Sequence, residues 1–230
     1  MQRKTIDLYT FTYNDEDMLP FFLDYYKFVD RMTFIDSGST DKTIKILTEF
    51  ATCNNPEIRI THTGYSWWND KELHEYRNFI WRDSKFDLIF FPDCDEIFYH
   101  PKLINYLNDT CFDVYEMDGF EMVSRDFPKS GTKITDIKTG FYHHMYNKST
   151  IFRPIKQMSF LNAHVRFSDT ANVNMGGIYL LHYRSLGIQM MMKRRDRFQK
   201  RTPKNYLQLM TDEQIRRAHR EYLQQAKVII

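Results

Sequence analysis

Short apolar runs alternate with helically spaced apolar residues through the first hundred positions of the chain. Four apolar runs predict strands, at residues 6–13, 32–35, 58–61 and 88–91. The segments between them show helical spacing and predict three helices, one entered at Pro20, one ending at Phe50 and one over residues 70–83. This βαβαβαβ order predicts an α/β fold with a mostly parallel sheet, right-handed crossovers and helices on both faces.

The fourth apolar run leads into the most informative polar residues, in the segment FDLIFFPDCDEIFYH. Leu88 to Phe91 are apolar without alternation, which is typical of a strand buried on both faces of a parallel sheet. Asp93 and Asp95 follow at the carboxyl end of this strand, where an extended backbone points both carboxylates one way and Cys94 the other. Such a pair favours a Mg²⁺ or Mn²⁺ site completed by substrate phosphates. The alternative is that the two aspartates cap the turn before Pro101.

The pattern changes in the second half of the chain. After Ser124 the alternation loosens, and scattered prolines and glycines predict loops. Residues 178–181 form one more apolar run, which predicts a strand that ends at His182. The segment from Lys193 to Arg220 is rich in Lys and Arg with apolar residues interleaved, and it predicts amphipathic C-terminal helices. Their basic face is either solvated or binds an anionic membrane.

Composition narrows the class of protein. The 230 residues are 42% hydrophobic and 16% aromatic, which is enough for one large domain or two small ones. A net charge of +2 and the lack of a recognised module argue against nucleic acid as a partner. Three cysteines without a CxxC pair indicate a reducing compartment, and no apolar stretch suits a signal peptide or a membrane span. We therefore expect a soluble or peripheral cytoplasmic protein.

The handling of phosphate is a further constraint on function. The sequence lacks the dinucleotide motif GxGxxG and the phosphate-loop motif GxxxxGK followed by Ser or Thr. Without a glycine-rich loop, the charge of a diphosphate must be met by a metal ion and basic side chains, here the two aspartates with their ion and Arg77. Asp36, at the end of the second strand, lies on the same edge of the sheet. It accepts a hydrogen bond from a base or ribose, or it caps the DSGSTD turn.

Seven short motifs in order carry a resemblance to a known family: YNDEDMLPFFLDYY, FIDSGSTDKT, HEYRN, FPDCDEIFY, KSTIFRP, NAH and LLHYRSL. Together they resemble the family 2-like glycosyltransferases of the GT-A fold, especially bacterial members that build surface polysaccharide such as capsule and lipopolysaccharide. The resemblance covers nearly the whole chain. It implies a Rossmann-like, mostly parallel sheet with helices on both faces, followed by C-terminal helices.

The resemblance also implies a donor site. Tyr13 and Asn14, after the first strand, and Asp36 are expected to hold the nucleotide, while Arg77 and Asp93 contact the rest of the donor. In this family the donor is a nucleotide diphosphate sugar, and a uridine diphosphate sugar is favoured. A carboxylate such as Asp36 accepts the N3–H of uracil, whereas cytosine offers no proton there.

A metal site is the second implication. Asp93 and Asp95 are expected to bind Mn²⁺ or Mg²⁺, and His182 in LLHYR is expected to supply a further ligand, since imidazole suits Mn²⁺. A buried histidine that ends an apolar strand is the alternative. The sequence departs from common family forms in having Cys94 between the aspartates and Asp15 where a glutamate is frequent, and neither change removes a ligand.

The acceptor chemistry needs a base, because in an inverting transfer a carboxylate deprotonates the acceptor hydroxyl. Candidates after the strand that leads into Asp93 and Asp95, the DxD motif, are Asp126, Asp136 and, less favoured, Glu121, with Asp126 preferred because it closely follows the apolar stretch 114–123. An ordinary solvated aspartate is the alternative for each. His164 is a candidate base or acceptor contact, or a structural histidine.

These implications divide the chain into three parts and leave other functions open. Residues 1–124 are expected to bind the nucleotide sugar, residues 125–185 to face a glycan or lipid-linked acceptor, and residues 186–230 to form the basic helices, with association at the inner face of the membrane. A non-catalytic nucleotide-sugar-binding module is an alternative. A sugar-phosphate nucleotidyltransferase is disfavoured because residues 1–20 contain no glycine, and a two-metal phosphoesterase because only one carboxylate pair is evident.

Overall fold

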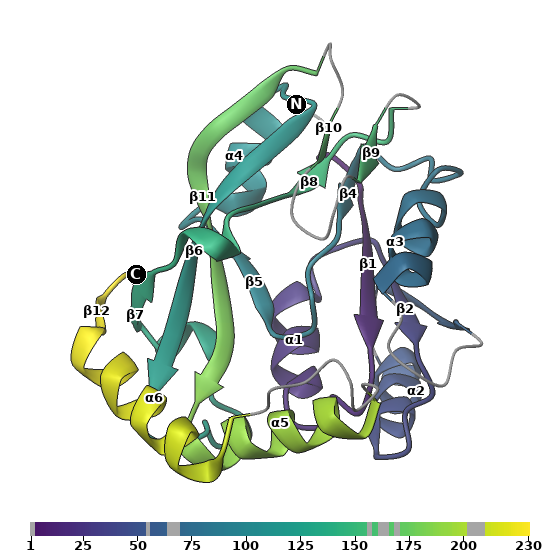
Figure 1. Cartoon of the computed structure of the whole chain (residues 1–230). Coiled ribbons are helices and arrows are strands. Elements are labelled where there is room, and N and C mark those ends of the chain that lie inside the picture. The colour runs from purple at the N-terminus through teal and green to yellow at the C-terminus, as the bar shows by residue number, and fades with distance from the viewer. Residues whose placement is uncertain are drawn as a thin grey trace.

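The computed structural model describes residues 3–53, 56–63, 70–155, 158–160, 166–167, 171–201 and 210–230. Its first half is an alternation of strands and helices: β1 (Ile6–Thr12), α1 (Leu19–Tyr26), β2 (Arg31–Asp36), α2 (Thr43–Cys53), β3 (Glu57–His62), α3 (Asp70–Phe79) and β4 (Leu88–Phe90). The strands pair in parallel in the order β3-β2-β1-β4 (Figure 1). The predicted βαβαβαβ order and parallel sheet are confirmed, although α3 ends four residues before the expected boundary.

Helices cover both faces of this parallel sheet because the strands are apolar on both sides. Leu8 and Phe90 belong to one buried cluster, together with side chains of α1, α2 and α4 (Leu103–Asp109). Their neighbours Tyr9 and Ile89 point to the opposite face and pack in a second cluster with Trp81, which follows α3. Side chains alternate along a strand, so one strand feeds two cores.

The second half extends the sheet with further strands, of which the sequence predicted only part of β11: β5 (Glu96–Tyr99), β6 (Val114–Ser124), β7 (Thr139–Tyr142), β8 (Lys148–Phe152), β11 (Val173–Leu186) and β12 (Lys227–Val228). Antiparallel β8 joins β4 to β6, and β11 runs parallel to β6 and antiparallel to β5. The predicted strand 178–181 is the middle of β11, but the expectation that this strand ends at His182 is wrong, because β11 continues to Leu186 in pairing with β6. Two shorter strands, β9 (Ser159–Phe160) and β10 (Arg166–Phe167), form a separate ribbon.

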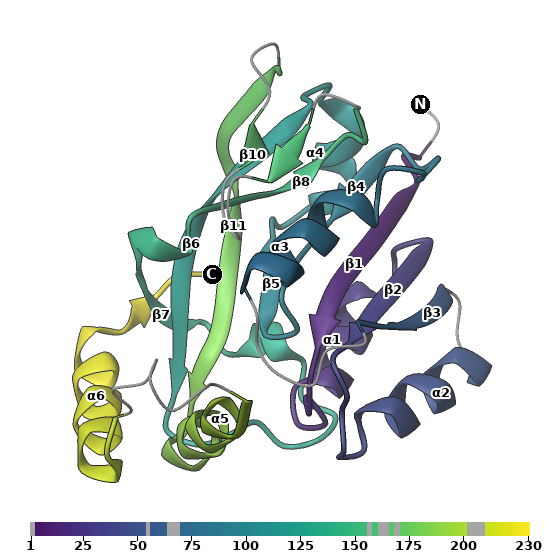
Figure 2. The same cartoon turned by 45° about the vertical axis from the view of Figure 1, so that its right-hand side comes forward.

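Two helices, α5 (Ile188–Arg201) and α6 (Asp212–Gln225), follow β11 and confirm that the described C-terminal segment is largely helical. Gly187 makes the turn into α5 with a φ of +77°, and a side chain there would meet the backbone after β6. Figures 1 and 2 show α5 crossing the end of the molecule toward which β1 points. The N-terminus of α6 is capped by Thr211 and Gln214 in a reciprocal capping box.

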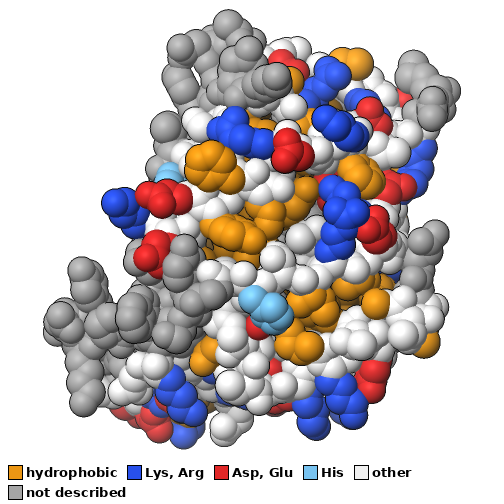
Figure 3. Space-filling model, turned by 90° about the vertical axis from the view of Figure 1, so that its right-hand side faces the viewer, with side chains coloured by type: hydrophobic (Ala, Val, Ile, Leu, Met, Phe, Trp, Pro, Cys, Tyr) orange, Lys and Arg blue, Asp and Glu red, His pale blue; other side chains and the backbone are white. Residues whose placement is uncertain are grey.

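One face of the molecule shows no dominant sign of charge (Figure 3). On the face shown in Figure 3, basic and acidic side chains of the described residues are interspersed around bands of hydrophobic surface. Within the described part of the chain, no helix has the length and apolarity needed to cross a membrane.

Candidate donor and metal site

The aspartates after β4 lie in a turn. The Glu96 amide donates to the Asp93 carbonyl at 2.9 Å, so the expectation of an extended backbone over this segment is wrong. As a result the two carboxylates have different surroundings: the Asp93 side chain is 38% exposed and that of Asp95 is 8% exposed. Cys94 turns into the core, where its thiol donates to the Phe11 carbonyl at 3.4 Å.

Asp93 is neutralised mainly by a buried lysine. Lys148, at the start of β8, places its Nζ atom 2.8 Å from Asp93 Oδ2 and 2.5 Å from Glu96 Oε1. The Lys148 side chain is 4% exposed. Burial alone would lower the pKa of Lys148, but the charges of Asp93 and Glu96 raise it above the usual range, so the ammonium stays charged. The three groups form one buried charge cluster beneath the turn.

Arg77 of α3 approaches Asp93 from the other side. Its Nη2 atom lies 3.5 Å from Asp93 Oδ1. The guanidinium also lies over aromatic rings, with its carbon 5.1 Å from the ring centroid of Phe11, 5.2 Å from that of Phe91 and 5.5 Å from that of Phe160. Such stacking favours a fixed cation beside the DxD turn. The position of Arg77 is therefore suited to the donor contact expected from the sequence.

Asp95 faces a histidine that is itself held by a glutamate. His182 Nε2, on β11, lies 3.4 Å from Asp95 Oδ2, and His182 Nδ1 lies 2.9 Å from Glu121 Oε2, on β6. The ring of Tyr146 packs on the imidazole, with the centroids 4.2 Å apart. Burial opposes protonation of the ring, but the carboxylates of Asp95 and Glu121 raise the pKa of His182 to about 10.

This arrangement fits a divalent cation. Asp95 Oδ2 is buried, and it faces His182 Nε2 at 3.4 Å and the Arg194 guanidinium, so positive charge is already gathered at this oxygen. Glu121 accepts from His182 Nδ1, so Nε2 faces Asp95, which is how metal-binding histidines are usually oriented. The described residues contain no group of three His, Cys, Asp or Glu side chains arranged around a metal. Two protein ligands would leave the remaining positions to phosphate and water.

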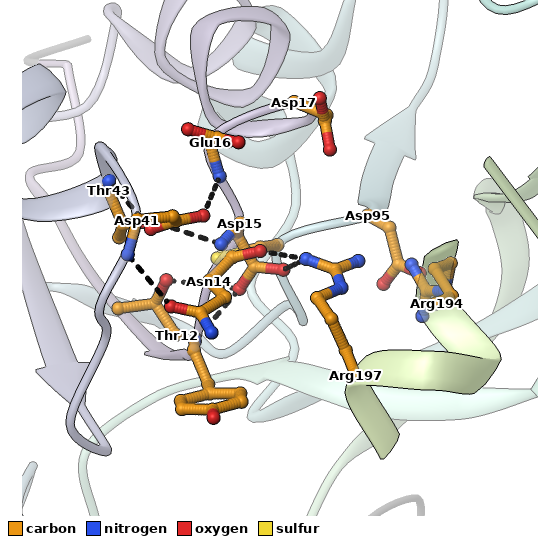
Figure 4. A network of polar contacts seen from close by, with 12 residues as sticks. Thr12, Asn14, Asp15, Glu16, Asp17, Asp41, Thr43, Asp95, Arg194 and Arg197 are labelled. Atoms are coloured by element: carbon orange, nitrogen blue, oxygen red, sulfur yellow. Dashed lines mark hydrogen bonds and ion pairs between the residues drawn. The ribbon is translucent and has the colours of Figure 1, made fainter. Parts of the chain in front are cut away.

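Helix α5 supplies further cations to the same edge. Arg194 ion-pairs with Asp95 Oδ2, and Arg197 contacts the Asn14 carbonyl and lies 3.2 Å from Asp15 Oδ1 (Figure 4). Lys193 reaches Asp17 at 2.6 Å. Although burial favours the neutral form, Arg194 and His182 hold the pKa of Asp95 well below its usual range. The basic residues of the predicted C-terminal segment thus turn partly toward the acidic site.

Hydrogen bonds connect the loop after β1 to the loop after β2. Asn14 adopts a left-handed backbone with a φ of 53°, and its Oδ1 accepts from the amides of Thr40 at 2.7 Å and Asp41 at 3.2 Å. The Asp15 amide donates to Thr43 Oγ1 at 2.8 Å. Asp15 in turn accepts from the Tyr13 amide at 3.0 Å. The residues expected at the nucleotide are therefore held together in one place.

Asp36 has the surroundings of a turn cap. Its Oδ2 accepts from the Gly38 amide at 3.0 Å, and its Oδ1 accepts from the Ser39 amide at 3.1 Å. His62 Nδ1 lies 3.2 Å from Oδ2, and Gly38 has a φ of +85°, as the predicted tight turn requires. A carboxylate oxygen can accept two hydrogen bonds, so Oδ1 keeps capacity for a further donor.

The candidate bases are not gathered at the site. Asp126 lies just beyond β6 and Asp136 lies in a one-turn 3₁₀ helix (Ile134–Asp136), and both side chains are exposed. His164 falls outside the described residues. Glu121, the least favoured candidate, is instead the one that contacts the site, through His182.

Sequence reasoning overlooked two of the cations that contact the aspartates. Lys148 opens β8, whose five residues are all buried, and a buried strand tolerates a charge only with a partner, but the mixed segment KSTIF does not reveal this burial from sequence. Arg194 lies in the run MKRRDR, where nothing distinguishes it from a solvated lysine or arginine.

The chain is similar to known proteins in sequence and in structure. The chain matches the model of glycosyl transferase family 2 over residues 8–169. No curated protein sequence matches it. Among solved structures it is similar to S. aureus TarS 1-349, with 14% identity, a TM-score of 0.47, and coverage of 95% of this chain and 70% of that one.

Two further solved structures are also similar. One is glucosyl-3-phosphoglycerate synthase of Mycobacterium tuberculosis in complex with uridine diphosphate, with 20% identity, a TM-score of 0.36, and coverage of 53% of this chain and 46% of that one. The other is HddC of Yersinia pseudotuberculosis, with 9% identity, a TM-score of 0.37, and coverage of 78% of this chain and 93% of that one. The chain spans 43% of the longer TarS structure.

The family match covers well over half of the chain, and it spans the parallel half of the sheet, the DxD turn and Lys148. The mixed α/β architecture is that of the GT-A fold, as predicted. The chain belongs to glycosyl transferase family 2.

Proposed function

We propose that this glycosyltransferase moves a sugar from a uridine diphosphate sugar to a hydroxyl of a glycan or lipid-linked acceptor, with inversion, in the synthesis of bacterial surface polysaccharide. The observation that carries the proposal is the Asp95–His182–Glu121 arrangement at the edge where the loops of Asn14 and Asp36 meet. Ligands of open α/β sheets bind at this edge, outside the carboxyl ends of the strands.

Asp95 and His182 would hold the divalent cation, Mn²⁺ or Mg²⁺, with His182 giving up its Nε2 proton when the ion binds, and Asp93 would contact the ion or the donor. A bound cation of this kind stabilises the charge that develops on a diphosphate leaving group. Arg77 supports the same charge, because its guanidinium is fixed over three aromatic rings next to Asp93. Tyr13, Asn14 and Asp36 are proposed to hold the nucleoside, since their loops are bonded to each other.

The acceptor side remains with the second half of the chain. The base is proposed among Asp126 and Asp136, whose side chains are exposed and free to meet an acceptor, with His164 as an acceptor contact. Residues 1–124 would then carry the donor, residues 125–185 the acceptor, and residues 186–230 the basic helices. Lys193, Arg194 and Arg197 already pair with acids of the chain, so association with the inner face of the membrane would rest on the other basic residues.

Calorimetry of UDP, GDP and CDP with Mn²⁺, followed by a hydrolysis and transfer assay with uridine diphosphate sugars, tests the proposal. We expect UDP to bind best and turnover to require metal. Asp95→Asn should abolish turnover with the fold intact, because the variant loses the charged ligand that faces His182. Full activity in excess chelator would contradict the metal role, tightest binding of GDP would contradict the uridine donor, and binding without turnover would indicate a non-catalytic module.

A further inference from the structure

Arg194 pairs with the carboxylate oxygen that the proposed metal ion would bind. Its guanidinium ion-pairs with Asp95 Oδ2, the same oxygen that faces His182 Nε2. The Asp95 side chain is 8% exposed and that of Arg194 is 26% exposed, so solvent screens the pair only in part. His182 and Arg194 both contact this oxygen, so a divalent ion that binds Asp95 Oδ2 would compete with the Arg194 guanidinium for it.

Once displaced from Asp95, the Arg194 side chain would lie close to a donor diphosphate bound at the same edge of the sheet. Arg194 and Arg197 lie three positions apart on α5, and both point into the acidic edge formed by Asp95 and Asp15 (Figure 4). A donor held by the Asn14 loop would bring its diphosphate to this edge. A guanidinium binds phosphate oxygens through two parallel hydrogen bonds, which makes arginine well suited to a diphosphate.

Arg195 shows that this orientation is particular to one face of α5. It lies next to Arg194 in the sequence, but it pairs with Asp196 at 2.7 Å and with Asp212 of α6 at 2.5 Å. Its charge is therefore committed to the junction of α5 and α6, away from the DxD turn. Arg195 has the same chemistry in the same helix and serves as the matched control.

We propose that Arg194 exchanges partners during the catalytic cycle: it neutralises Asp95 in the protein without donor, and it binds the donor diphosphate when a divalent cation takes Asp95. This inference rests on the proposed function for the identity of the donor. It assigns a diphosphate-binding residue to α5 and makes binding of metal and donor mutually dependent.

The test is calorimetry on the full chain with Arg194→Gln and Arg195→Gln. Arg194→Gln removes the competing cation, so Mn²⁺ alone should bind about tenfold more tightly than to the wild type. The same variant loses hydrogen bonds to phosphate, so UDP at saturating Mn²⁺ should bind roughly 10- to 100-fold more weakly. The affinity of Arg194→Gln for uridine, which carries no phosphate, should equal that of the wild type. Arg195→Gln should change neither the Mn²⁺ affinity nor the UDP affinity.

Shifts of opposite sign separate exchange from a structural role. If both affinities fall in Arg194→Gln, or neither changes, Arg194 does not exchange and the inference is wrong. Arg194→Lys offers a second variant that keeps the charge: Mn²⁺ affinity should stay near that of the wild type, while UDP affinity falls because the fork of donors is lost. If wild-type protein binds no UDP, the proposed function fails, whereas the Mn²⁺ measurement alone still reports on the competition for Asp95.

Discussion

The site has a proposed nucleotide side, at Asp36, and a proposed metal side, at Asp93 and Asp95. The carboxylates of the two sides are paired in different ways. On the nucleotide side, Asp36 accepts hydrogen bonds from amides two and three positions further along the chain. On the metal side, Asp93 is matched by Lys148, 55 positions away, and Asp95 by His182 and Arg194 from two other elements. Backbone amides are fixed by the turn itself, whereas side-chain cations depend on packing and can be displaced.

This difference predicts where single substitutions are costly. A buried charge that loses its only strong partner leaves an uncompensated ion, while a turn that loses one acceptor retains its other hydrogen bonds. Variants on the metal side should therefore lose stability or metal affinity. Variants on the nucleotide side should alter ligand preference and leave the fold nearly unchanged.

The largest effect is expected for Lys148→Met. Removal of this 4% exposed ammonium leaves Glu96 buried without its cation, and breaking such a pair typically costs about 3–5 kcal/mol of unfolding free energy. Urea denaturation followed by circular dichroism measures the loss. Lys45→Met is the matched control, because Lys45 is 71% exposed, and its pairing with Glu49 should contribute less than about 1 kcal/mol.

A second substitution identifies the cause of that loss. If an uncompensated Glu96 is responsible, adding Glu96→Gln to Lys148→Met should recover part of the stability, because the bare charge is removed. A loss of less than about 1 kcal/mol in Lys148→Met, or no recovery in the double variant, would contradict a buried charge cluster beneath the DxD turn.

Glu121→Gln should weaken the binding of Mn²⁺ by about 10- to 100-fold, the range seen when a partner of a metal-ligating histidine is changed. The variant keeps the shape of Glu121 but removes the charge that holds His182 Nδ1 at 2.9 Å. Calorimetry of Mn²⁺ alone measures the change without any assay of transfer. Glu116→Gln, on the same strand, is the control and should bind Mn²⁺ as the wild type does.

Unchanged Mn²⁺ affinity in Glu121→Gln would mean that His182 is oriented by packing, for which Tyr146 is the nearest ring. Nitrogen chemical shifts of the His182 ring would then separate the two explanations, because they report which ring nitrogen carries the proton.

The sequence predicted the N-terminal half of the fold well, because the strands and helices there follow from local sequence patterns. Strands β1 to β4 are short apolar runs separated by helices, and parallel pairing follows from their order. The antiparallel strands β7 and β8 are four and five residues long and lie among loops, so their pairing with β6 depends on long-range contacts that no local pattern encodes.

The site divides in the same way. Asp93, Asp95 and His182 could be proposed because each closely follows an apolar run of the sequence, although β11 continues past His182 to Leu186. The partnership of Glu121 with His182 could not, because it follows from the register of β6 against β11, which pairs these two residues. The pairing of Arg194 with Asp95 could not be predicted for a different reason, because it depends on where α5 packs across the edge of the sheet.

The smallest effect is expected for Asp36→Asn, on the nucleotide side. Asparagine has one side-chain oxygen, and at the place of Oδ2 it lies within hydrogen-bond distance of both the Gly38 and the Ser39 amides, so the unfolding free energy should change by no more than about 1 kcal/mol. A hydrogen bond from uracil N3–H to a neutral acceptor is weaker than one to a carboxylate by roughly 1 kcal/mol, so UDP should bind about 5- to 10-fold more weakly. The amide nitrogen of asparagine can donate to the unprotonated N3 of cytosine, so CDP should bind more tightly to the variant than to the wild type. The ratio of UDP affinity to CDP affinity should therefore fall by more than the UDP affinity itself. Calorimetry of both nucleotides with Mn²⁺ measures the ratio, and an unchanged ratio would mean that Asp36 only caps its turn.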